Sequence, residues 1–284
     1  LVEVAAWQRA KGHPFDLHTE ASLDLAGEPE LLDAMVDAGF SAVFVGIETP
    51  NPASLREAQK SQNLRMDPAE AVRTLTRAGL EVFAGFIVGF DADDETIFDR
   101  QIEFISSLPI PRAMAGILSA LPGTQLWRRL EKEGRLRTHA TGDQFDRPNF
   151  ETAMDEVALV QGYRRLMASI YSEEGYFARC ERQLLESPHR SVALRPGSIA
   201  GLLRALWRIG ILGERRRWFW RLLRHALRIG GVPALAKAVT LSVLGEHLVR
   251  YTREEVLPRL DARLAEMRAE RAGKALPAAR PAAA

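Results

Sequence analysis

Four polar residues stand where short apolar runs of this chain end. Glu48 and Asp91 are carboxylates at or just after two of the runs, and Glu20 and Thr124 follow two others. A carboxylate in such a place can accept hydrogen bonds from a ligand. If the runs are parallel strands, these side chains gather at one edge of the sheet, where active sites lie. The alternative is that loops after strands are simply polar.

The run from Val82 to Val88 is the strongest strand signal. It is short and apolar, it is closed by Gly89, and a helix-start signal follows it, as in a buried strand of a parallel sheet. Gly85 and Gly89 flank Ile87 in this run. Glycines admit a close approach of the backbone, either by a neighbouring element or by a flat ligand, and both readings stay open here.

Strands and single helices alternate around this run. We expect strands at residues 15–19, 42–47, 82–88 and 113–119, and Glu20 is expected just past the first of them. We expect helices at residues 2–11, 28–38, 67–78 and 94–107, with another opened by Thr124. Such alternation implies right-handed crossovers and a parallel sheet, either open or closed.

Composition excludes several classes of protein. Of 284 residues, 38 are Lys or Arg and 37 are Asp or Glu, so no global charge favours a polyanionic partner. The single cysteine, Cys180, excludes a disulfide within the chain and a thiolate-based metal site, and we expect it to be a packed structural thiol. No uncharged apolar run of about 18 residues occurs, so we expect no transmembrane helix.

Several segments resemble a known barrel. Residues 19–26, 44–51 and 85–91 resemble the third, fourth and fifth strands of a radical S-adenosylmethionine (SAM) barrel, and residues 121–126 resemble its sixth-strand exit. Motifs between residues 142 and 179 resemble the start of a helical C-terminal extension of unknown function, of the DUF4070 type. That extension is found in the cobalamin-binding radical SAM group that includes hopanoid methylases. The resemblance covers nearly the whole chain.

The resemblance implies a SAM site at the strand ends. The adenine would lie against Gly85, Ile87 and Gly89, and Glu48 would accept hydrogen bonds from the ribose. Glu20 matches a position where Gln is commoner in the group, which leaves its contact undefined. Asp91 is a further cofactor-binding candidate, as are Asn51 and Thr124, although a turn-forming or helix-capping role is the better interpretation of these three.

The resemblance also implies groups that this chain cannot hold. Radical SAM enzymes bind a [4Fe–4S] cluster through a Cys-x3-Cys-x2-Cys loop, and this group binds cobalamin in a preceding domain. Neither the three cysteines nor the first two strands occur in this sequence. We therefore expect no metal ligands here, and we expect the chain to be the C-terminal part of a longer enzyme that is inactive by itself.

Residues 204–228 are strongly basic and contain interleaved tryptophans. Three interpretations remain open. The arginines could extend along the surface of an ordinary helical domain whose aromatics pack inward. The segment could contact a membrane surface, or it could bind nucleic acid, which is the least favoured of the three.

We therefore expect an α/β protein, with a partial (β/α) radical SAM barrel at residues 1–140 and an all-α extension at 141–260. A fading helix and an Ala- and Pro-rich tail would occupy residues 261–284. The resemblance implies a cytoplasmic, cobalamin-dependent methyltransferase that acts on an unactivated carbon of a lipid-like or other small substrate. The alternatives are a radical SAM reaction other than methylation and a non-catalytic, membrane-associated binding protein.

Overall fold

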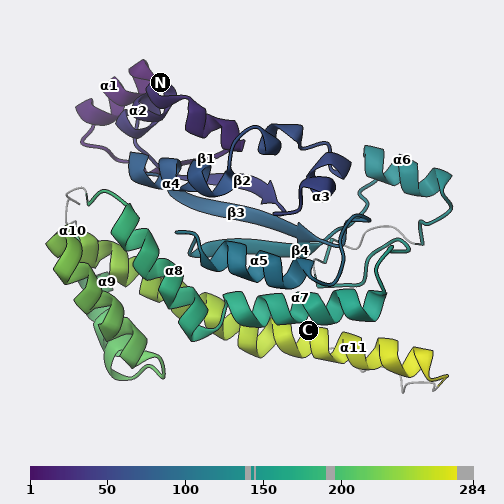
Figure 1. The fold of residues 1–284 in the computed structure, drawn as a ribbon. Coiled ribbons are helices and arrows are strands. Elements are labelled where there is room, and N and C mark those ends of the chain that lie inside the picture. Colours follow the sequence, from purple (N-terminus) through teal and green to yellow (C-terminus); the bar gives the residue numbers. More distant parts are fainter. Residues whose placement is uncertain (138–141, 144, 190–195, 274–284) are drawn as a thin grey trace.

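The centre of the protein is a sheet of four parallel strands. A computed structural model describes residues 1–137, 142–143, 145–189 and 196–273. The strands lie in the order β1-β2-β3-β4. They are β1 (Leu17–Ala21), β2 (Phe40–Glu48), β3 (Glu81–Val88) and β4 (Arg112–Ile117). The parallel sheet predicted from the alternation of strands and helices is therefore confirmed, and the strands end on the right of Figure 1.

Three main helices lie in the connections between consecutive strands. They are α2 (Pro29–Asp37), α4 (Pro68–Ala78) and α5 (Ile97–Ser106). The bounds of α4 follow from its sequence, because the Asp67 side chain accepts a hydrogen bond from the amide of Ala69 and Gly79 ends the helix with φ 109°. Shorter elements are α1 (Val2–Ala10), η1 (Leu23–Gly27), α3 (Pro52–Glu57), η2 (Ser61–Leu64) and α6 (Gln125–Lys132).

The two faces of the sheet differ in burial. Along β3, residues from Val82 to Val88 alternate strictly between buried and partly exposed positions. The buried set packs against the helices, as where the ring of Phe86 meets that of Phe104 on α5 edge to face at 6.4 Å. The other set, which contains Phe83, Gly85 and Ile87, lies on a face that is partly open. This open face carries the candidate site.

A helical extension follows the sheet. It comprises α7 (Glu156–Ile170), α8 (Glu173–Glu186), α9 (Pro196–Ala205), the π-helical η3 (Leu206–Ile211), α10 (Arg216–Tyr251), the π-helical η4 (Thr252–Val256) and α11 (Leu257–Arg271). Helix α10 is interrupted at Gly231, whose backbone is not helical, and then returns beneath α7 and α8 (Figure 1).

Buried polar contacts join the extension to the sheet. Arg179 on α8 is completely buried and donates from Nε to the carbonyl of Ile110, just before β4, at 2.8 Å. Tyr163 and Tyr171 donate to carbonyls of β4 itself. The extension and the sheet therefore share one core, which runs from Leu23 to Met267.

The first strand differs in position from the sequence-based expectation, and two other expectations fall outside the described residues. Glu20 was expected just past the first strand, but it lies within β1, because this strand begins and ends about two residues later than the alternating pattern indicated. The boundary expected between residues 140 and 141, and the tail from residue 274, lie outside the described residues.

One helical stretch is long enough to cross a membrane. Within residues 216–271, an 18-residue window is apolar enough for a membrane span, judged by length and composition only. In this structure 22% of that window is buried inside the protein. Buried core helices pass the same test, and Ala234, Ala238 and Leu241 are fully buried here. The absence of a transmembrane helix therefore remains a prediction.

Candidate functional site

Glu48 ends β2 in an unusual conformation. Its φ is 69°, in the left-handed region that a non-glycine residue rarely adopts. The pairing with β3 shifts at the same point, so that Gly46 lies opposite Gly85 while Glu48 lies opposite Phe86. The carboxylate turns back over Gly46, since a Cβ added there would lie 2.5 Å from Glu48 Oε1. The strand end thus places the carboxylate on the open face.

Neighbouring side chains hold this arrangement. Lys60 Nζ lies 3.3 Å from Glu48 Oε1, and the Glu48 side chain is only 13% exposed. The buried Asn63 donates from Nδ2 to the carbonyl of Gly46 at 2.9 Å, which fastens the loop after α3 to the strand end. The sequence pattern did not single out Lys60 or Asn63, because neither belongs to a strand or follows one directly.

Glycines of β2 and β3 lie opposite each other on the open face, beneath neighbouring side chains. Gly46 and Gly85 are opposite each other in the ladder, and Gly85 is also opposite Met114 of β4. A Cβ at Gly85 would touch the ring of Phe44 at 3.0 Å, so the backbone there is closely flanked. Ile87 lies one step further along the same face, opposite Gly116. The structure therefore brings Glu48, Gly85 and Ile87 together on one surface.

Glu20 lies on the neighbouring strand. It is exposed and is opposite Phe44, so it shares the open face with Glu48 but sits earlier along the strands. A group that reached both carboxylates would have to extend across β1 and β2.

A buried carboxylate that the sequence pattern did not identify organises the strand ends. Asp93 Oδ2 accepts the amides of Gly89 and Phe90 at 3.0 and 3.1 Å. Its Oδ1 accepts from Asn51 Nδ2 at 3.1 Å and from Ser54 Oγ at 2.6 Å. Gly89, with φ 98°, is thereby fixed in the turn after β3. Asp93 is one of three aspartates between residues 91 and 94, and nothing in their spacing distinguishes it.

Asp91 contacts arginines. Arg135 donates to both of its oxygens at 2.6 and 2.8 Å, and Arg129 donates to Oδ2 at 3.0 Å. The hydrogen bonds from Arg135 lower the pKa of Asp91 below its ordinary value, against the effect of partial burial. Asp91 therefore links the turn after β3 to Arg129 on α6 and to Arg135 in the segment that follows α6. Its cofactor-binding role stays a prediction.

The capping interpretations of two other candidates are confirmed. The Asn51 side chain accepts from the amide of Ala53 at the start of α3, and that of Thr124 accepts from the amide of Trp127 at the start of α6. Cys180 is fully buried, and burial raises the pKa of its thiol to about 12, as expected of a packed structural thiol. Among the described residues, no group of three or more His, Cys, Asp or Glu side chains could hold a metal ion.

Residues 124–258, from the cap of α6 to the start of α11, match a family described as a domain of unknown function, DUF4070. The chain contains a DUF4070 domain. The resemblance inferred from the motifs between residues 142 and 179 is thereby confirmed.

The chain is also similar to named methyltransferases. It is 35% identical to an uncharacterized methyltransferase of Synechocystis over 88% of this chain and 48% of that protein. It is 32% identical to the hopanoid C-2 methylase of Rhodopseudomonas palustris over 89% of this chain and 49% of that protein. A bacteriochlorophyllide d C-12(1)-methyltransferase of Chlorobaculum tepidum is 23% identical over 56% of this chain and 35% of its own length. The chain thus spans about half the length of the first two relatives.

Proposed function

We propose that this chain is part of a methyltransferase of the radical SAM type, and that the open face of β2 and β3 holds the nucleoside of SAM. The observation that carries the proposal is Glu48, held at φ 69° with its carboxylate over Gly46. Left-handed backbone at a non-glycine residue costs about 1–2 kcal/mol. Such strain gathers at ligand sites, and the similarity to named methyltransferases supports this reading.

The residues present fit the nucleoside. The ring of Phe44 beside Gly85 and the side chain of Ile87 offer apolar surface against which a purine can lie. The Glu48 carboxylate can accept hydrogen bonds from both ribose hydroxyls, as acidic residues do in dinucleotide sites. Lys60, 41% exposed, orients the carboxylate and neutralises its charge. When bound, SAM supplies the methyl and adenosyl groups on which this class of reaction depends.

The residues present do not fit an iron–sulfur cluster. A cluster with one open iron needs three thiolates, whereas the one cysteine of the chain is buried in the helical extension. No residue here is assigned to cobalamin either. We therefore propose that other parts of the whole protein bind the cluster and cobalamin. We also propose a lipid-like substrate for the whole protein, which the similarity to the hopanoid C-2 methylase supports.

Nucleoside binding to the chain tests the proposal. We expect 5′-deoxyadenosine to bind in equilibrium titrations, and 2′,5′-dideoxyadenosine, which lacks one ribose hydroxyl, to bind more weakly by about tenfold. Glu48→Ala should weaken the binding of 5′-deoxyadenosine to the level of 2′,5′-dideoxyadenosine, so that the variant no longer distinguishes the two nucleosides. Glu103→Ala, a change of an exposed carboxylate on α5, is the control. Equal binding of the two nucleosides by wild type, or no effect of Glu48→Ala, would reject the site.

The reaction type is tested on the full-length gene product. Transfer of the labelled methyl group of SAM to a lipid extract, reduced by Glu48→Ala, is the expected result. Release of 5′-deoxyadenosine without methyl transfer would instead assign a radical SAM reaction of another kind. If the full-length protein binds the nucleoside but forms neither product, the result would indicate a non-catalytic binding role.

A further inference from the structure

A helical hairpin exposes large apolar side chains. It consists of α9, η3 and the first half of α10, and its tip lies between Ile211 and Arg215, at the lower left of Figure 1. The exposed side chains, with their exposed fractions, are Leu203 (61%), Trp207 (58%), Ile211 (51%), Leu212 (64%), Trp220 (42%) and Leu227 (54%). Apolar residues gathered in this way on one unit mark an interaction surface.

The same hairpin carries an excess of positive charge. Between residues 200 and 230 there are eight arginines and one acidic residue, Glu214. Three of the arginines pair with carboxylates: Arg215 with Glu173 and Glu246, Arg217 with Glu173, and Arg221 with Glu181. The other five make no ion pair with another described residue: Arg204, Arg208, Arg216, Arg224 and Arg228. The free charge therefore favours an anionic partner.

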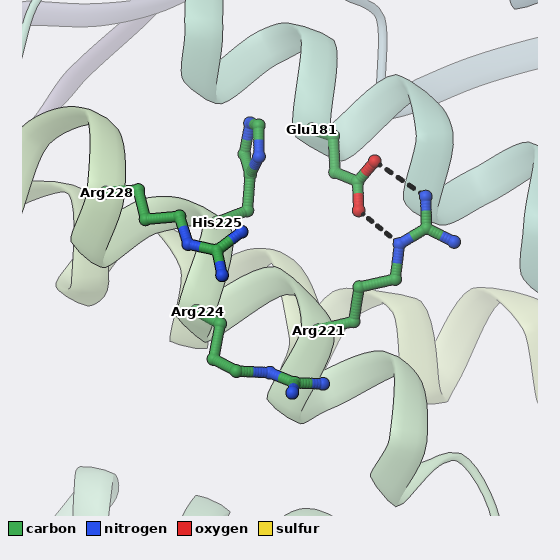
Figure 2. Close-up of a pocket in the computed structure, with 5 residues that line it drawn as sticks. All are labelled: Glu181, Arg221, Arg224, His225 and Arg228. Atoms are coloured by element: carbon green, nitrogen blue, oxygen red, sulfur yellow. Dashed lines mark hydrogen bonds and ion pairs between the residues drawn. The ribbon is translucent and has the colours of Figure 1, made fainter.

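Part of this charge surrounds a cavity of about 320 Å³ between α8 and α10 (Figure 2). Its single acid, Glu181, is bound by Arg221 through two hydrogen bonds of 2.7 and 2.9 Å. Arg224 and Arg228 also line the cavity. The ring nitrogen Nε2 of His225 is buried there without a hydrogen-bond partner among the described residues. Guanidinium groups around such a cavity suit the oxygens of a phosphate group.

The apolar and basic residues of α10 lie on one face. With 3.6 residues per turn, Trp220, Arg224 and Leu227 fall on adjacent turns of the same side. The opposite side is packed, since Phe219 is buried and the ring of Trp218 stacks on that of Phe177 at 5.6 Å. The packing interpretation of this basic segment therefore holds for one face of the helix. The outer face has the mixture of Trp, Leu and Arg that is typical of a helix lying on a bilayer.

We propose that this hairpin docks on a membrane surface rich in anionic phospholipids. Leu203, Trp207, Ile211 and Leu212 enter the headgroup layer, the free arginines meet lipid phosphates, and the cavity at Arg224 and Arg228 takes one headgroup. Nucleic acid offers phosphates too, but it leaves the apolar tip without a partner. The hairpin lies toward the end of the sheet where the strands begin, whereas Glu48 lies where they end (Figure 1). Docking is therefore independent of nucleoside binding.

Vesicle flotation with the chain tests the proposal. We expect binding to vesicles of phosphatidylcholine with phosphatidylglycerol and little binding to phosphatidylcholine alone. The variant Arg224→Gln with Arg228→Gln should weaken binding by about tenfold or more, because each basic residue near an anionic surface contributes about a fivefold factor. The matched control is Arg100→Gln with Arg128→Gln, two exposed arginines on α5 and α6.

A second variant separates apolar contact from charge. Replacing Trp207, Ile211 and Leu212 with Ser should abolish flotation, and since these side chains are exposed the fold should persist, as circular dichroism can verify. The matched control replaces Val2, Val4 and Trp7 of α1, which are also exposed. Docking is supported if vesicle flotation is lost in the hairpin variants and not in the controls, while nucleoside binding is unchanged in all of them.

Other results would overturn the proposal. Equal flotation of all variants, or none by wild type, excludes a lipid site on the hairpin. A dimer in light scattering that dissociates in the tip variant assigns the face to a second copy of the chain. If the chain does not float with vesicles but binds inorganic phosphate at Arg224 and Arg228, the cavity is a site for free phosphate. Duplex DNA that binds in place of vesicles identifies a nucleic-acid face.

Discussion

The hydroxyl of Tyr163 on α7 donates to the carbonyl oxygen of Ala115 on β4 at 2.8 Å. Tyr171 makes the same contact with Ala113 at 2.7 Å. Because β4 is the last strand of the sheet in the part of the chain that the structure describes, no further described strand satisfies these carbonyls. Two tyrosines of the helical extension therefore satisfy two carbonyls at the edge of the sheet, and such an edge is otherwise a site for unwanted pairing.

Tyr163→Phe should destabilise the protein. The change removes the donor and leaves the Ala115 carbonyl buried without this partner, at a cost of about 1–3 kcal/mol in the free energy of unfolding. Urea denaturation measures the effect. Tyr251→Phe, at a partly exposed tyrosine on α10, is the control and should change little. Equal stability of Tyr163→Phe and wild type would mean that the hydroxyl does not hold the edge.

Glu48→Gly should separate stability from binding. Glycine adopts φ 69° without strain, so the free energy of unfolding should stay level or rise by up to about 1 kcal/mol, while nucleoside binding weakens by about tenfold. Glu48→Ala keeps a Cβ and should weaken nucleoside binding to the same extent without that gain in stability. The lost contact with the 41% exposed Lys60 contributes little. A glycine variant less stable than the alanine variant would show that the strand end is not strained.

Asp93→Asn should weaken the turn after β3. An amide nitrogen would face donors that the carboxylate now accepts from, such as the amides of Gly89 and Phe90 or the hydroxyl of Ser54. We expect a loss of about 2–3 kcal/mol in thermal or urea unfolding. Asp99→Asn, at a 68% exposed carboxylate on α5, should stay within about 0.5 kcal/mol of wild type. Similar losses at both positions would contradict the role of Asp93.

The effect of Asp91→Asn on the free energy of unfolding should depend on pH. The folded-state pKa of Asp91 lies below its ordinary value of 3.8, mainly because Arg135 donates to the ionised form. Its stabilising effect is therefore present above about pH 3.8 and is lost as the pH falls through the lower folded-state pKa. At neutral pH the variant should lose about 1 kcal/mol in the free energy of unfolding, allowing for solvent screening, and this difference from wild type should shrink as the pH falls below 3.8. A difference independent of pH would mean that ionisation of Asp91 is not involved.

What the sequence by itself determined is local. Gly79 and Asp67 bound α4 through backbone conformation and capping, and the short apolar run from Val82 to Val88, closed by Gly89, marked β3. These features depend on neighbours a few residues away, so pattern is enough. Order along the chain also implied parallel strands, because a single helix between two strands returns the chain to the same edge.

Only the tertiary structure decided which polar residues meet. Asp91 and Asp93 are two positions apart, yet one binds arginines of a later segment and the other is the buried centre of the strand ends. Lys60 and Asn63 reach β2 through a loop, and Tyr163 reaches β4 across 48 positions of sequence. Such contacts depend on how separate elements pack, and the spacing of residue types does not record that.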